Sequence, residues 1–125
     1  MRRRMSVAVG ALPLFLLSLC GGPAHARDTS KGREVYSLCG ACHPTDSSNG
    51  AGPGLAGIVG RKAGTAAGFR YSRAMKSSGI IWDDKTLDAY IGEPQRVIPG
   101  NVMPFSGIAD PGARADLVEY LKTLK

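Results

Sequence analysis

The sequence predicts an all-α domain, and three observations support this fold class. Beyond residue 28, apolar residues recur at helical spacing in several segments that begin with residues typical of helix N-caps. No segment alternates apolar and polar residues over a length useful for a strand. The connections are rich in glycine and proline, which mark loops. We therefore expect one small domain of helices joined by ordered loops.

The N-terminal segment, residues 1–26, has the pattern of a cleaved secretory signal peptide. Arginines at 2–4 precede an apolar run at 5–19, and the segment ends in an A-x-A sequence at 24–26. The apolar run is shorter than the roughly 18 residues that a spanning helix needs. We expect export to a bacterial periplasm and a mature domain of residues 27–125 that is not inserted in the membrane. An uncleaved anchor and a lipoprotein signal at Cys20 are the alternatives.

The net charge of the chain limits the kinds of binding partner that we expect. The full chain has a formal charge of +6, but without the three arginines at 2–4 the balance falls to 13 basic against 10 acidic residues. These basic residues are scattered and are not interleaved with aromatic residues. We therefore do not expect a nucleic-acid partner.

The first helix is expected from Thr29 or Ser30 to Cys39, and it leads into the sequence CGACH at 39–43. Four interpretations compete for this sequence: a zinc site, a redox dithiol, a structural disulfide and the attachment site of a covalent haem. In the mature domain Cys39 and Cys42 are the only cysteines, and His43 is the only histidine. A structural zinc site normally has four protein ligands, so one is lacking.

The remaining interpretations differ in how much of the motif they explain. A thioredoxin-like dithiol needs a preceding strand, which the sequence lacks, and a disulfide leaves His43 without a role. Two thiols three positions apart can form thioethers with one porphyrin, and the adjacent imidazole can then bind its iron. The sequence therefore favours one covalently bound haem c, with Cys39 and Cys42 as attachment points and His43 as an axial ligand.

The second axial ligand is expected to be Met103. A second histidine is excluded by count, and the mature domain has only two methionines, Met75 and Met103. Met75 lies in a short predicted helix that ends at Gly79, where packing is the commoner role of methionine. Met103 lies in a loop made rigid by prolines on both sides. A packing role for Met103, a lysine ligand and an open sixth position remain the alternatives.

Two further helices follow from capping and periodicity. One begins near Asp83 or Asp84, places apolar residues at 87, 90 and 91 on one face, and stops at Gly92 and Pro94. The other begins at Asp110 with Pro111 in its first turn, and its apolar stripe runs from 117 to 124. Ordering the many glycine-rich loops costs conformational entropy, and an apolar porphyrin at the centre of the domain would offset that cost.

From about Gly32 onward, the chain resembles a class I cytochrome c of the mitochondrial and bacterial cytochrome c2 type. The resemblance rests on five ordered segments, CGACH, GPGLAGIVGRKAG, FRYSRAMKSSGIIW, TLDAYIGEPQRVIPGNVMPFSGI and RADLVEYLKTLK. It implies three to five helices wrapped around a single covalent haem.

The same resemblance implies a function. The protein would be a monomeric periplasmic one-electron carrier between respiratory or photosynthetic redox complexes, and not an enzyme. Its donors and acceptors would be membrane redox complexes or periplasmic oxidoreductases, and thioether ligation together with haem burial predicts a positive potential. The alternative is a haem protein with a labile sixth ligand that binds gases or serves as a dedicated oxidoreductase subunit.

The resemblance also implies roles for individual residues around the haem. A carbonyl would orient the axial imidazole, three side chains would surround a buried propionate, a tyrosine hydroxyl would lie near the axial sulfur, and an aromatic ring would lie near the exposed haem edge. These residues are, in that order, Pro53; Arg61, Tyr71 and Trp82; Tyr90; and Phe105. Ordinary turn, surface or core roles are the competing interpretations.

Three features depart from the family pattern. The resemblance implies that the first helix, at Gly32 and Tyr36, crosses the last helix, at Leu117, Tyr120 and Leu121. Cys39 follows Tyr36 by three positions, where many relatives have four, so the register of this contact is open. Met75 stands where many relatives have a polar residue. Mitochondrial members of the family surround the haem edge with lysines that steer them to acidic partners. Most of these lysines are absent here: the corresponding residues are Leu38, Gln95, Val102, Ala109 and Asp110, and only Arg96 keeps a positive charge. We therefore expect docking that is more apolar and less sensitive to salt.

Overall fold

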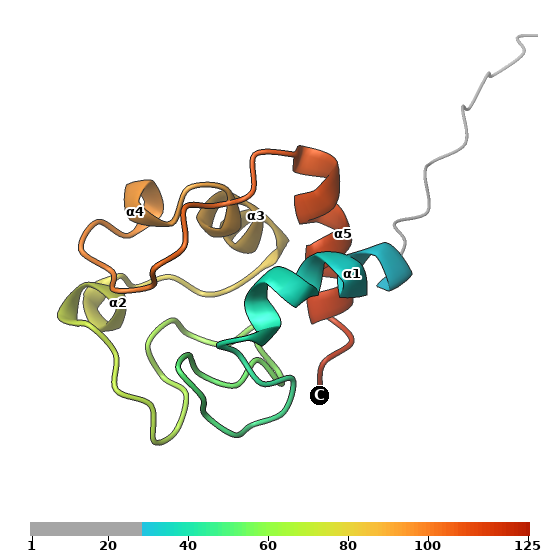
Figure 1. Cartoon of the computed structure of the whole chain (residues 1–125). Coiled ribbons are helices and arrows are strands. Elements are labelled where there is room, and N and C mark those ends of the chain that lie inside the picture. The colour runs from blue at the N-terminus through green and yellow to red at the C-terminus, as the bar shows by residue number, and fades with distance from the viewer. Residues whose placement is uncertain (1–28) are drawn as a thin grey trace, which may run out of the picture.

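The computed structural model describes residues 29–125, and this part of the chain is helical, as expected (Figure 1). Its five helices are α1 (Thr29–Gly40), α2 (Arg73–Ser77), α3 (Asp84–Gly92), α4 (Pro94–Val97) and α5 (Pro111–Leu121). The described residues form no strand beyond one isolated bridge between Lys62 and Ile81. The predicted signal peptide lies outside the described residues. No helix from residue 29 onward is both long and apolar enough to cross a membrane.

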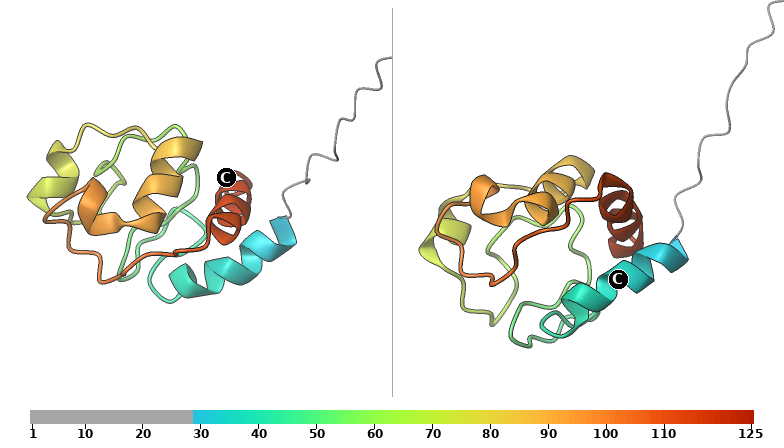
Figure 2. Two further views of the ribbon diagram at one scale, coloured as in Figure 1. Left: turned by 90° about the horizontal axis from the view of Figure 1, so that it is seen from above. Right: turned by 45° about the horizontal axis from the view of Figure 1, so that its top comes forward.

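Helices α1 and α5 cross each other at one end of the molecule, and α2 lies at the other end (Figure 2). Gly32 is buried at this crossing, where an added Cβ would lie only 2.1 Å from the carbonyl oxygen of Asp116. The rings of Tyr36 and Tyr120 pack with their centroids 5.2 Å apart. The terminal helices therefore make the expected contact in spite of the short interval between Tyr36 and Cys39.

Local capping explains where α3 and α5 begin. The Asp83 carboxylate accepts the Thr86 N–H at 2.7 Å, and the Thr86 hydroxyl in turn accepts the Asp83 N–H at 2.8 Å, which completes a capping box. Asp110 caps α5 by accepting the Gly112 N–H at 2.9 Å. Both helices thus begin where the sequence predicts.

Helix α4 was not expected as a separate element. The sequence predicts its first residue, Pro94, only as a stop signal for the preceding helix. Proline lacks the N–H that a first helical turn leaves unpaired, so it can also start a helix. Pro94 therefore ends α3 and begins α4 two residues after Gly92.

Long loops connect the helices and are fixed by backbone hydrogen bonds between distant segments. The Gly57 N–H donates to Leu124 O at 3.0 Å, and the Gly60 N–H donates to Trp82 O at 2.7 Å. Gly107 has a φ of +106°, and a Cβ there would lie 2.0 Å from Gly92 O, so the loop before α5 can approach α3 only at a glycine.

Arg114 of α5 connects that loop to α3. Its guanidinium lies 2.8 Å from the Asp88 carboxylate and donates to the carbonyls of Ile108 and Ala109, both at 2.9 Å. One side chain thereby orders the chain that leads from the Met103 loop into α5.

Candidate functional site

A cavity of about 350 Å³ lies between the helices and the long loops, and its lining is mainly apolar. The described structure brings every candidate residue of the sequence analysis to this one cavity. They are Cys39, Cys42, His43, Pro53, Arg61, Tyr71, Trp82, Tyr90, Met103 and Phe105. Because these residues span more than sixty positions of the chain, the cavity is a product of the whole fold.

The end of α1 positions the CGACH segment. The N–H groups of Cys42 and His43 donate to Cys39 O at 3.0 and 2.9 Å, which continues the helical turn past Gly40. The Tyr36 hydroxyl donates to His43 O at 2.5 Å. Burial, followed by the charges of Cys39 and Tyr120, raises the pKa of Tyr36 to about 12, so this donor keeps its proton at neutral pH.

The two cysteines do not form a disulfide with each other. Cys39 is half-buried and Cys42 is exposed, and both face the cavity. Burial, and then the neighbouring Cys42, raises the pKa of the Cys39 thiol.

The His43 imidazole has a fixed orientation. Its Nδ1 donates to Pro53 O at 2.8 Å, which leaves Nε2 as the nitrogen available to a metal. Gly52 packs directly on the ring, because a Cβ at this residue would lie 2.4 Å from His43 Cε1. The backbone of residues 52–53 thus holds the imidazole by both a hydrogen bond and close packing.

The Met103 thioether lies in the same cavity, in the loop between α4 and α5. Its Sδ is 4.0 Å from the Tyr90 hydroxyl, which is placed to donate to the sulfur. Burial raises the pKa of Tyr90 to about 12, so the hydroxyl remains a donor at neutral pH. The Tyr90 ring also packs on Trp82, with the centroids 5.0 Å apart.

The polar residues expected near a propionate line the cavity but also have protein partners. Arg61 donates to Gly54 O at 3.0 Å and to Ala56 O at 3.2 Å. The Tyr71 hydroxyl accepts the Ala66 N–H at 3.2 Å and keeps its own proton for a further bond. Trp82 is buried. These contacts fix the side chains in place beside the cavity.

The lining fits a covalently attached haem. It combines a large apolar surface for a porphyrin with two thiols for thioether bonds, one oriented imidazole and one thioether. Imidazole and thioether together are one axial ligand pair that iron takes in electron-transfer haem sites.

Two exposed apolar side chains stand at the rim of the cavity. Leu38 on α1 is 61% exposed, and Val102 beside Met103 is 74% exposed. Both also line the cavity, as does the half-buried Phe105. The rim is therefore apolar at two of the positions where the resemblance led us to compare this chain with the lysines of mitochondrial members.

The sequence analysis missed three residues that organise the site. Gly52 packs on the imidazole, and Asn101 and Gln95 hydrogen-bond the loop that carries Met103. Glycine and asparagine are common in turns, so the sequence gives no sign of the roles of Gly52 and Asn101, and it indicates Gln95 only as a replacement of a surface lysine. Their partners are known only from the folded chain.

A helical domain that encloses an apolar cavity, with C-x-x-C-H at its wall and a loop methionine in the lining, defines the class of small c-type haem proteins. Comparison with known proteins is consistent with this class. Residues 29–125 match the Cytochrome c family, and the chain belongs to that family.

Individual relatives agree. The chain is 50% identical over 91 residues to cytochrome c2 iso-2 of Magnetospirillum molischianum, an alignment that covers 72% of this chain and 94% of the relative. It is 46% identical to cytochrome c2 of Rhodomicrobium vannielii, with 78% and 80% covered. Among solved structures, cytochrome cH from Methylobacterium extorquens superposes with a TM-score of 0.74 at 42% identity, covering 77% of this chain and 98% of that one.

Family membership settles three general points. The protein has a class I cytochrome c fold, it carries covalently attached haem c with iron, and it is a single-haem electron carrier rather than an enzyme. The bound haem supplies an iron that alternates between the ferric and ferrous states.

Proposed function

We propose that the protein is a soluble periplasmic one-electron carrier whose haem is attached to Cys39 and Cys42 and whose iron is ligated by His43 and Met103. One observation carries the ligand assignment. The oriented His43 imidazole and the Met103 sulfur line the same cavity, and each is held by a partner, Pro53 O and the Tyr90 hydroxyl. Two protein ligands would leave no coordination site for substrate chemistry, as suits electron transfer.

The ligand assignment is tested by the visible spectrum of the exported, haem-loaded protein. Thioether ligation gives ferric haem an absorbance band in the far red. We expect this band in the wild-type protein, its loss in Met103→Ala, and its retention in the matched control Met75→Leu, because Met75 lines the cavity but is not a proposed ligand. Absence of the band from the wild-type protein at neutral pH would instead favour a labile sixth ligand, and hence a gas-binding protein or a dedicated oxidoreductase subunit.

Around the rest of the haem, we assign Arg61, Tyr71 and Trp82 to one propionate and Phe105 to the exposed edge. The side chains of Arg61 and Tyr71 carry N–H and O–H groups at the cavity wall, which would offset the cost of burying a carboxylate. Reduction potentials of Arg61→Gln and Tyr71→Phe test this role. Loss of a donor to a buried anion leaves more negative charge near the iron, so both potentials should fall.

Export is a separate proposal that rests on residues 1–26. The mass of the protein recovered from the periplasm should equal residues 27–125 plus one haem. Recovery of the protein with residues 1–26 attached to membranes would overturn the assignment of a cleaved signal.

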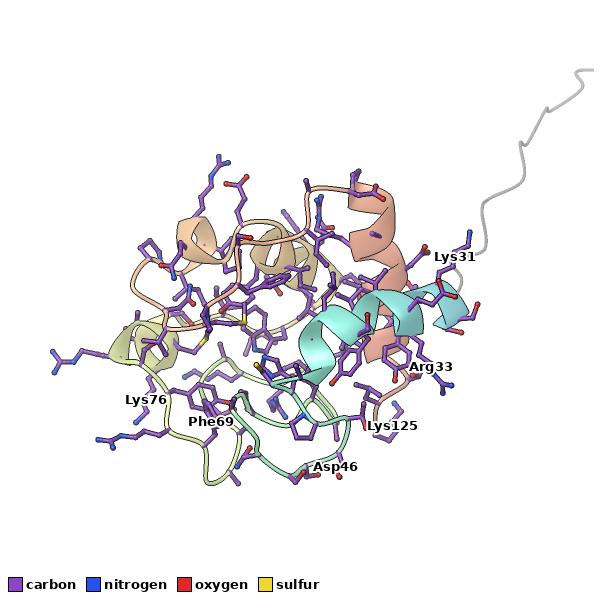
Figure 3. The ribbon with its side chains drawn as sticks, in the orientation of Figure 1. Lys31, Arg33, Asp46, Phe69, Lys76 and Lys125 are labelled. Carbon is purple, nitrogen blue, oxygen red and sulfur yellow. The ribbon has the colours of Figure 1, made fainter. Side chains whose placement is uncertain are left out.

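Docking to redox partners is proposed to occur over the apolar rim at Leu38 and Val102. Four exposed cations lie between residues 62 and 76, around and within α2, and none of them lines the cavity: Lys62, Arg70, Arg73 and Lys76. Figure 3 shows Lys76 and Phe69 on the side of the molecule opposite Lys31, Arg33 and Lys125. Contact through the rim would bury apolar area rather than pair charges.

Electron-transfer rates to a purified bacterial cytochrome c oxidase test the docking surface. Leu38→Ser should slow the second-order reaction more than the control Lys76→Gln, which removes an exposed charge but no rim surface. Added salt should change the wild-type rate only a few-fold. A steep fall of the rate with salt, or a larger effect of Lys76→Gln than of Leu38→Ser, would contradict the proposal.

A further inference from the structure

Asn101 is the only buried polar or charged residue in the described part of the chain, at 5% exposure. It lies two residues before Met103, in the loop that follows α4. Burying an amide is unfavourable unless its donor and acceptor groups are paired. Its position beside the proposed sixth ligand therefore calls for a specific explanation.

The Asn101 side chain uses both ends of its amide. Its Nδ2 donates to Pro94 O at 3.0 Å and to Ile98 O at 2.9 Å, so it is bonded to the first residue of α4 and to the residue that follows the helix. Its Oδ1 accepts the Met103 N–H at 3.0 Å. The side chain thus joins the backbone of Met103 to a helix that packs on α3.

Gln95 holds the same loop from the solvent side. Its Nε2 donates to Asn101 O at 2.8 Å, and its Oε1 accepts the Gly100 N–H at 3.3 Å. One exposed amide and one buried amide, both anchored on α4, therefore hold the backbone of residues 100, 101 and 103. We call Gln95 and Asn101 the amide pair.

The Tyr90 hydroxyl contacts the Met103 sulfur only at 4.0 Å, so the direction of the Met103 side chain also depends on this loop. Methionine is unbranched and has three rotatable bonds, so the sulfur reaches a defined point only if the backbone is held. Gly100, at the start of the loop, has a φ of +85° and no side chain that could anchor the loop. On the C-terminal side of Met103, the Phe105 N–H donates to Met103 O at 2.9 Å. This bond joins two residues of the same loop and does not anchor the loop to a helix.

We propose that Asn101, supported by Gln95, is a positioning residue that keeps the Met103 sulfur directed at the iron and so controls how easily another ligand replaces it. The proposal rests on the ligation by Met103 proposed above. The amide pair does not touch the iron site itself; it acts through the backbone of Met103. Loss of the amide pair should increase the population of loop conformations in which the sulfur has left the cavity.

Imidazole binding to the ferric, haem-loaded protein provides the first test. Imidazole can occupy the sixth position only after Met103 has left, so its apparent affinity reports the population of the displaced loop. We expect Asn101→Ala to bind imidazole at least about tenfold more tightly than the wild type, since it removes three hydrogen bonds and leaves backbone groups unpaired. Gln95→Ala should act in the same direction but more weakly, because its bonds are exposed.

The control variant is Asn49→Ala. Asn49 also uses both ends of its amide on loop backbone, donating to Ala67 O at 2.9 Å and accepting the Gly54 N–H at 3.4 Å, but it has no bond to α4 or to residues 99–103. Its imidazole affinity should equal that of the wild type. Asn101→Thr should lie between the wild type and Asn101→Ala, because a hydroxyl can still accept the Met103 N–H and donate to one carbonyl.

A second readout separates positioning from general stability. Urea unfolding is followed both by the far-red band and by far-UV circular dichroism. In the wild type and in Asn49→Ala the two transitions should coincide, whereas in Asn101→Ala the band should be lost at a lower urea concentration than the helices. If Asn101→Ala does not fold, Gln95→Ala tests the proposal in the same way, because Gln95 is exposed.

The outcomes distinguish the two proposals. If the wild-type ferric protein has the far-red band, but Asn101→Ala and Gln95→Ala match Asn49→Ala in both measurements, the role of the amide pair is wrong and ligation by Met103 stands. If the wild-type protein lacks the band, ligation by Met103 is wrong, and the role assigned to the amide pair is wrong with it.

Discussion

The packing of Gly52 on the His43 imidazole leads to a quantitative prediction. A Cβ at Gly52 would lie 2.4 Å from Cε1, 2.7 Å from Nδ1 and 2.8 Å from Nε2 of the ring. Carbon atoms in ordinary contact are about 3.5–4.0 Å apart, so Gly52→Ala requires a shift of about 1 Å. Neither side can shift freely: the Gly52 N–H donates to Cys42 O at 2.8 Å, and the ring is bonded to Pro53 O at 2.8 Å.

The expected loss of stability follows from these contacts. Overpacking a filled site costs about 1–3 kcal/mol, and losing the bond between His43 and Pro53 adds about 0.5–1.5 kcal/mol. Gly52→Ala should therefore lower the free energy of unfolding by about 2–4 kcal/mol. A loss of about 3 kcal/mol corresponds to a melting temperature lower by roughly 12–24 °C for a domain of this size.

The assay is thermal unfolding of the ferric, haem-loaded protein followed by far-UV circular dichroism. The control is Gly40→Ala, at the end of α1, where a Cβ would make an ordinary contact of 3.5 Å with the Tyr36 ring. This control should change stability by less than about 1 kcal/mol. A melting temperature for Gly52→Ala that matches the control would refute the close packing of Gly52 on the imidazole.

The reduction potential of Gly52→Ala gives an independent measurement. The Pro53 carbonyl increases the donor strength of the imidazole by accepting the proton on Nδ1. Weakening this bond makes His43 a poorer donor to ferric iron, so the potential should rise. A lower potential would contradict this role for Pro53.

Three further predictions follow from single contacts. Tyr90→Phe removes the donor to the Met103 sulfur, which strengthens the sulfur as a donor to ferric iron. The potential should fall by about 20–40 mV for a bond of about 0.5–1 kcal/mol, and an unchanged value in spectroelectrochemical titration would contradict the contact. Gly32→Ala should cost about 2–4 kcal/mol in urea unfolding, because its Cβ would overlap the backbone of α5; a cost below about 0.5 kcal/mol would mean that the helices do not cross there. Asp83→Ala should destabilise the protein at neutral pH, because hydrogen bonds from Thr86 lower the pKa of Asp83. This contribution is present above the unfolded-state pKa of about 3.9 and is lost as the pH falls through the lower folded-state value. The difference in melting temperature between Asp83→Ala and the wild type should therefore shrink on acidification. A difference that stays constant with pH would mean that the cap is absent.

Much of the site could be predicted because its chemistry is local or can be reached by elimination. The spacing of Cys39, Cys42 and His43 brings the three groups together on one turn of chain whatever the rest of the fold does. The absence of another histidine in residues 27–125 excluded a second histidine ligand and favoured one of the two methionines in that range. Capping residues such as Asp83 and Asp110 define helix starts through contacts two or three residues away, and both helices begin as predicted.

Features that depend on distant contacts could not be predicted in the same way. The extra helix α4 depends on Pro94, which ends the helix before it and begins the helix after it. The role of Gly52 depends on a ring nine positions earlier, and that of Asn101 on the carbonyls of a helix that the sequence did not predict. None of these contacts leaves a periodic pattern or a motif.

The sequence by itself determined the chemistry of this protein: an α-helical chain, a covalent haem at one motif and one loop methionine as the favoured second ligand. The tertiary structure decided the geometry, which includes the cavity, the orientation of the imidazole by Pro53 and Gly52, and the support of the Met103 loop by the amide pair. The physical reason is the range of the interactions. Covalent attachment and helix capping act between residues that are neighbours in the chain, whereas packing and loop hydrogen bonds exist only after folding has brought distant segments together.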